Sequence, residues 1–77
     1  MATVTVRHMK QNETGIITTI DTGGELGRRI RDMGIIPGAK ITVRGRAPLQ
    51  DPVSVQVAGT MLALRNNEAD HINVELS

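Results

Sequence analysis

The chain has no cysteine and no aromatic residue, and these two absences narrow what its 77 residues can build. Without cysteine there is no disulfide, no thiolate metal ligand and no thiol nucleophile, which suits a reducing compartment. Without Phe, Trp or Tyr the core must be aliphatic, and each fully buried Val, Leu or Ile contributes about 1.5–3 kcal/mol. We therefore expect a single domain over residues 1–77 that uses most of its apolar residues for its own core.

Long apolar runs and recognisable catalytic motifs are also absent. No run approaches the roughly 20 residues that span a bilayer, and the polar start MATVTVRHMK lacks the apolar centre of a secretory signal. We expect a cytoplasmic protein without direct membrane insertion. The segment TGGELG lacks the Lys and hydroxyl residue of a phosphate loop, so we interpret it as a strand-to-helix turn. Because no nucleophile stands beside a base, we assign no catalytic residue and expect no enzyme.

The strongest pattern lies between Lys40 and Arg65, where apolar residues alternate in three short runs. A period of two puts every second side chain on one sheet face, so this stretch predicts an antiparallel meander. The first two runs are joined by the connector RAPLQDP and the last two by a turn at Gly59. Met61, within the third run, is expected to fill the core.

Further strands are predicted before and after the meander. They cover residues 3–7, as a strand or an extended arm, and residues 16–20 and 72–76. Because Ile16 and Ile17 are both apolar, the 16–20 strand is expected to be covered on both faces. Five or six short antiparallel strands in so small a chain favour a barrel, in which closure removes exposed edges.

One α-helix is predicted over about residues 24–33 and one helical turn over about residues 66–70. The apolar stripe of the helix consists of Leu26, Ile30 and Met33. Gly34 suits the left-handed residue that ends a helix, and the Pro-Gly pair that follows suits a type II turn. Asn66 is the expected N-cap of the short turn.

Charge is unevenly distributed along the chain, although the net charge is only +1. Residues 28–46 contain six Lys or Arg and one acid, while the segment after Arg46 is mainly acidic. The basic segment indicates either an anionic partner or a solvated surface. Nucleic acid is not expected, because the chain has no aromatic platform for bases. Near the C-terminus Glu68, Asp70 and His71 could make a weak oxygen-rich site for a divalent metal, or a solvated cap on a short turn.

The order of these segments resembles a known family. The helix RRIRDMGIIPGAKITV, the connector RAPLQDPV, the strand pair VSVQVAGTMLALR and the turn NNEADHINVE are similar to ferrous iron transport protein A, FeoA. The resemblance implies an SH3-like barrel that serves as a cytoplasmic accessory of FeoB, the ferrous iron transporter with a GTPase domain. It implies neither enzyme activity nor a required cofactor.

Several residues are candidates for contacts with such a partner. The exposed arginines of the helix and two connector residues are the predicted partner-binding set: Arg28, Arg29, Arg31, Arg46 and Leu49. Leu49 at the connector tip could tuck into the core edge or form an exposed docking knob. Two alternatives remain: an SH3-like regulatory module of an iron-dependent transcriptional repressor, and the weak metal binder described above.

Overall fold

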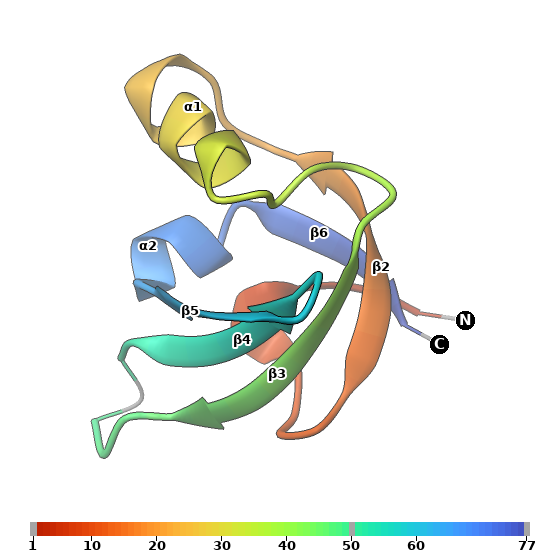
Figure 1. Cartoon of the computed structure of the whole chain (residues 1–77), viewed down its shortest axis with the longest axis vertical. Helices are drawn as coiled ribbons and strands as arrows, with labels where there is room; N and C mark the ends of the chain where they lie inside the picture. The colour runs from red at the N-terminus through yellow and green to blue at the C-terminus, as the bar shows by residue number, and fades with distance from the viewer. Residues whose placement is uncertain (1, 50, 77) are drawn as a thin grey trace.

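The computed structural model describes residues 2–49 and 51–76, and it shows a six-stranded antiparallel sheet that curls around an aliphatic core (Figure 1). The strands are β1 (Thr3–Thr5), β2 (Thr14–Ile20), β3 (Lys40–Arg46), β4 (Val53–Val57), β5 (Thr60–Leu64) and β6 (Ile72–Leu76). The helical elements are the 3₁₀ turn η1 (Val6–His8), α1 (Gly24–Asp32) and α2 (Asn66–Ala69). The strand order is β1-β6-β2-β3-β4-β5, which confirms a mainly β fold with six strands.

The predicted meander is confirmed in β3, β4 and β5, which pair in sequence order. Val43 lies opposite Val55, and Val53 lies opposite Leu64, so apolar residues from all three strands meet on the inner face. These four side chains are fully buried. The period-two alternation of the sequence therefore fixed the register of this half of the sheet.

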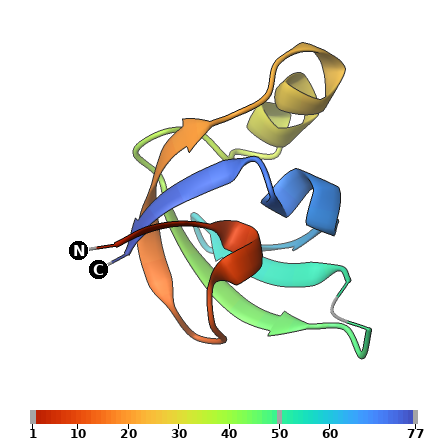
Figure 2. The same ribbon diagram turned by 180° about the vertical axis from the view of Figure 1, so that it is seen from behind.

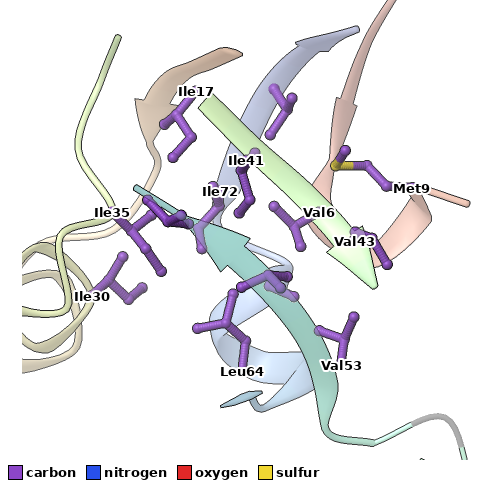
Figure 3. Close-up of a cluster of buried hydrophobic side chains, with 14 residues drawn as sticks. Val6, Met9, Ile17, Ile30, Ile35, Ile41, Val43, Val53, Leu64 and Ile72 are labelled. Atoms are coloured by element: carbon purple, nitrogen blue, oxygen red, sulfur yellow. The ribbon is translucent and has the colours of Figure 1, made fainter. Parts of the chain in front are cut away.

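The core is filled by side chains from every strand and from the segments around α1 (Figure 3). Ile17, Ile41 and Ile72 come from three different strands, while Ile30 and Ile35 reach in from α1 and the loop after it. All five are at most 1% exposed. Packing of α1 onto one end of the curled sheet thus depends on a few aliphatic side chains and no aromatic one.

The two edges of the sheet, β1 and β5, are bridged by short helical elements. η1 follows β1 directly, α2 follows β5, and η1 and α2 contact each other. The prediction of a strand or extended arm through Arg7 is wrong at its end, because β1 stops at Thr5. Turning into a 3₁₀ helix at this point carries Val6 into the core, where it is fully buried.

The predicted helix and the turn after it are confirmed. α1 has nine residues, with Ile30 buried and with Leu26 and Met33 packed against the core from its margin. Gly34 has φ of 89°, and Ala39 N–H donates to Ile36 C=O at 3.1 Å around Gly38, as in a type II turn. No helix of the described residues is long and apolar enough to cross a membrane.

Two apolar side chains expected in the interior are on the surface. Ile16 is 42% exposed and Met61 is 54% exposed. The predictions that β2 is covered on both faces and that Met61 fills the core are therefore wrong. The physical reason is the pleat: Ile17 and Leu64 point inward, and residues an odd number of positions away on the same strand must point outward. No helix lies over this outer face in either ribbon view (Figure 1, Figure 2).

Candidate partner-binding surfaces

The arginines of α1 lie on the side of the helix that faces away from the core. Arg28, Arg29 and Arg31 are all exposed, while Ile30 between them is buried. Arg29 Nη1 lies 3.6 Å from Glu68 Oε2 of α2, with its side chain still 67% exposed. Within the described residues, Arg28 and Arg31 make no ion pair. The helix thus presents a small positive surface, as its periodicity predicted.

The connector between β3 and β4 holds its apolar tip in solvent. Ala47 N–H donates to Pro52 C=O at 3.0 Å, which closes the base of the loop. Leu49 is 90% exposed, so it forms a knob and does not tuck into the core edge. Gln50, next to it, lies outside the described residues. Single exposed apolar side chains are common on protein surfaces, and contact with a partner would remove the apolar area of this one from water.

Arg46, a member of the predicted partner-binding set, makes hydrogen bonds within the fold. Its side chain is half-buried, and Nη2 donates to the carbonyl oxygens of Arg7 at 2.7 Å and Met9 at 2.8 Å. A longer contact of 3.4 Å reaches Val6 C=O. These carbonyl groups lie within η1 or directly after it. Their hydrogen bonds with the guanidinium therefore connect the end of β3 to this 3₁₀ turn. The partner-binding role predicted for Arg46 stays a prediction, and part of its hydrogen-bonding capacity is already used within the fold.

The other end of the connector is tied to α2. Asp51 Oδ1 accepts the backbone N–H of Asn66 at 3.0 Å, and Asp51 Oδ2 lies 3.9 Å from Arg65 Nη1. Glu68 Oε1 accepts the backbone N–H of Arg65 at 2.9 Å. The residue at the N-cap position is thus Arg65, and Asn66, our predicted N-cap, is the first residue of the helix. Two carboxylates take the capping role that we assigned to an amide side chain.

The residues proposed as a metal site are divided among these structural contacts. Glu68 is only 4% exposed and is bound to Arg65 and Arg29 as described. Asp70 pairs with Arg7, whose Nη1 lies 3.0 Å from Asp70 Oδ2. In the part of the chain that the structure describes, no three His, Asp or Glu side chains gather so that they could hold a metal ion. The weak metal site through Glu68, Asp70 and His71 has no support in this geometry.

The two surfaces with candidate contacts are not adjacent. α1 and the connector lie at opposite ends of the molecule in both ribbon views (Figure 1, Figure 2). A small concavity of about 290 Å³ lies beside Arg29, lined by Glu25, Leu26 and Asn67 as well, between α1 and α2. The sequence did not indicate this hollow, because it depends on how two helices distant in the sequence pack.

These features define a structural class, a small SH3-like barrel of six antiparallel strands. The sequence pattern of the FeoA domain matches residues 4–76. The chain belongs to the FeoA domain family, which confirms the resemblance seen in the sequence.

Relatives of known name agree with this assignment. The Fe(2+) transport protein A/Fe(2+) transporter FeoB fusion protein of Porphyromonas gingivalis is 36% identical over 64 residues. That match covers 83% of this chain but spans only 8% of the fusion protein. A FeoA-like protein from Clostridium acetobutylicum is 30% identical with a TM-score of 0.90, and the match covers 99% of this chain and 88% of that one.

More distant structures bear on the fold alone. FeoA of Stenotrophomonas maltophilia, described as a procaryotic SH3 domain protein, is 24% identical with a TM-score of 0.82 over 94% of this chain and 89% of that one. A manganese-dependent transcriptional repressor is 20% identical with a TM-score of 0.88, over 97% of this chain and 42% of the repressor. The repressor therefore shares a barrel of the same shape, and this shared shape is not an argument for shared function.

Proposed function

We propose that this chain is a cytoplasmic accessory of a FeoB-type ferrous iron transporter and binds the transporter's cytosolic GTPase region without catalysing a reaction itself. The observation that carries the proposal is the Porphyromonas gingivalis relative, whose name joins transport protein A and transporter FeoB in one polypeptide. Joining two modules in one chain holds them at high effective concentration. A fusion of this kind indicates that the two modules work together, which supports a functional association of the separate proteins.

The exposed side chains give the proposed contact two parts. Arg28 and Arg31 on α1 supply positive charge that steers an acidic partner surface toward this end of the molecule. Leu49 at the other end supplies an apolar anchor, and burial of a leucine side chain contributes about 1.5–3 kcal/mol. Because the two lie at opposite ends, the proposal requires separable contributions from each.

The test is surface plasmon resonance with the purified chain and the cytosolic domain of the FeoB from the same organism. Leu49→Ser should raise the dissociation rate and weaken binding by about ten- to a hundredfold, since apolar burial is lost. Reversal of Arg28, Arg29 and Arg31 to Glu should instead lower the association rate and its dependence on salt. The matched controls are Ile36→Ser, at another exposed apolar residue, and a variant with Lys at the three arginine positions.

The result decides between the parts of the proposal. If neither the leucine change nor the charge reversal alters binding, the proposed contact surfaces are wrong. If the native chain does not bind the FeoB cytosolic domain at all, the accessory function through that region is wrong. If Ile36→Ser weakens binding as much as Leu49→Ser, the connector has no special role.

A further inference from the structure

The outer face of the meander carries a groove that neither α1 nor the connector forms. It has a volume of about 390 Å³ and lies over β3, β4 and the turn between β4 and β5. Its lining residues are Ala39, Lys40, Thr42, Arg44, Gln56, Ala58 and Gly59. The lining contains two cations and two other polar side chains but no acid.

The two cations of the groove are not neutralised by the fold. Within the described residues, the ion pairs join other arginines to Asp51, Glu68 and Asp70, and neither Lys40 nor Arg44 takes part in one. Glu13, whose backbone C=O accepts the N–H of Val43 beside Arg44, uses its own Oε1 to accept the N–H of Lys10. Glu75 of β6 is separated from Lys40 by Ile16 of β2. The groove therefore keeps its positive charge, available to a ligand from outside the chain.

The side chain of Arg44 is oriented by its neighbours. The pairing of β3 with β4 shifts between Val43 and Gly45, so Arg44 is the extra residue of a β-bulge. Arg44 Nε donates to Gln56 Oε1 at 2.9 Å. This bond fixes the plane of the guanidinium, and among the described residues no acceptor binds its two terminal nitrogens. Those nitrogens form the fork that binds a carboxylate with two parallel hydrogen bonds.

Exposed apolar side chains flank the polar groove on both sides. Ile16 pairs with Lys40 across β2 and β3, and Met61 pairs with Gln56 across β4 and β5. The floor between them is Thr42, which is almost buried and whose Oγ1 lies 2.8 Å from Thr14 Oγ1. A ligand that covers this face must present acidic groups at the centre and apolar groups at the margins.

We propose that this groove, formed between Lys40 and Arg44 on the outer face of β3 and β4, binds an acidic, extended segment of a partner protein. Lys40 and Arg44 are four residues apart on one strand, which is roughly 13 Å along it. Carboxylates four positions apart on an extended peptide share a face and are also roughly 13 Å apart. A free phosphate would meet the cations but leave Ile16 and Met61 uncovered.

The proposal goes beyond the accessory function, because it names a surface separate from α1 and the connector. The proposed binding of an acidic segment in the groove does not depend on whether that segment belongs to FeoB or to another protein. The two proposals can therefore fail independently.

The test is an NMR titration of the isotope-labelled chain with a short synthetic peptide that has two Glu residues four positions apart and a Val midway between them, so that all three side chains lie on one face of the extended peptide. Saturable shifts are expected at backbone amides of β3 and β4. Replacing Lys40 and Arg44 together by Gln should weaken binding about tenfold, since two exposed charge contacts are lost. The matched control replaces Arg28 and Arg31 by Gln, which makes the same charge change on α1 and should leave the affinity unchanged.

The comparison peptides separate the possible ligands. A peptide with Gln in place of Glu should not bind, and added salt should weaken binding of the acidic peptide. The proposal is overturned if the acidic peptide gives no saturable shifts, if the shifts map to α1, or if the control variant weakens binding equally. Inorganic phosphate that produces the same shifts at the same concentration would also overturn it, because the groove would then be a simple anion site.

Discussion

Replacement of Glu68 tests whether this carboxylate is structural. Glu68 is buried, and its Oε1 accepts the N–H of Arg65 at the start of α2. Glu68→Ala leaves that donor without its acceptor, and a hydrogen bond to a charged group contributes about 1.5–3 kcal/mol. The contact with Arg29 adds less, about 0.5 kcal/mol, because the arginine is mostly exposed. The expected loss in the free energy of unfolding is about 2–3 kcal/mol.

For a domain of this size such a loss lowers the melting temperature by about 10–20 °C. The measurement is thermal and urea unfolding followed by circular dichroism in a buffer that contains a chelator. Glu75→Ala, at an exposed carboxylate, is the matched control and should change stability by less than about 0.5 kcal/mol. The reasoning is refuted if Glu68→Ala melts like the native chain under chelation while ferrous iron stabilises only the native chain. Glu68 would then be a metal ligand.

Four further substitutions test three other features of the fold by urea unfolding. Arg46→Ala removes the guanidinium that holds η1 and should cost about 2–3 kcal/mol; a loss below about 0.5 kcal/mol would show that the turn does not need it. Ala58 has a φ of 51°, which is unfavourable for a residue with a Cβ, so Ala58→Gly should stabilise the protein by about 0.5 kcal/mol. Gly59 has a φ of 80°, so Gly59→Ala should destabilise it by about 1 kcal/mol. Changes of the opposite sign would contradict backbone strain in this turn. Gly15→Ala places a Cβ against the Val74 side chain and should cost about 2–3 kcal/mol, so native-like unfolding would show that β2 and β6 can separate freely.

The regular elements could be predicted because their causes are local. The alternation between Lys40 and Arg65 specifies strands, and the turn residues between them leave only an antiparallel order. The apolar stripe of α1 and the glycine after it predict a helix end at about residue 33, and the observed helix ends at Asp32. The family match over residues 4–76 includes all of these segments.

The wrong predictions concern apolar residues for which the sequence allows more than one environment or local conformation. Ile16 and Ile17 are equally apolar, yet only one can face inward, and the sequence does not say whether a second layer covers the other. Val6 fits a continued strand as well as a 3₁₀ turn, since both carry it inward. Apolar residues are common on protein surfaces, so hydrophobicity alone could not place Met61.

The polar contacts between distant segments could not be predicted, because local sequence patterns do not show which segments meet. Arg46 binds carbonyls near the N-terminus, and Asp51 caps a helix that begins fifteen positions later, at Asn66. Local spacing instead grouped Glu68, Asp70 and His71 as a metal site. Closeness in the sequence made these carboxylates look like one cluster. In the structure Glu68 pairs with Arg29, and Asp70 pairs with Arg7.

This assignment of carboxylates changes the meaning of the uneven charge along the chain. Three acids of the C-terminal half are paired with Arg7, Arg29 and Arg65, only one of which comes from the basic segment of residues 28–46. The acidic tail therefore does little to neutralise that segment. Of its remaining cations, Arg46 is bound to backbone carbonyls, and the others face solvent on α1 and on the outer face of β3. A net charge of +1 thus coexists with a positive surface on these two elements. Association with an acidic partner should consequently be fast and sensitive to salt, although the whole chain is almost neutral.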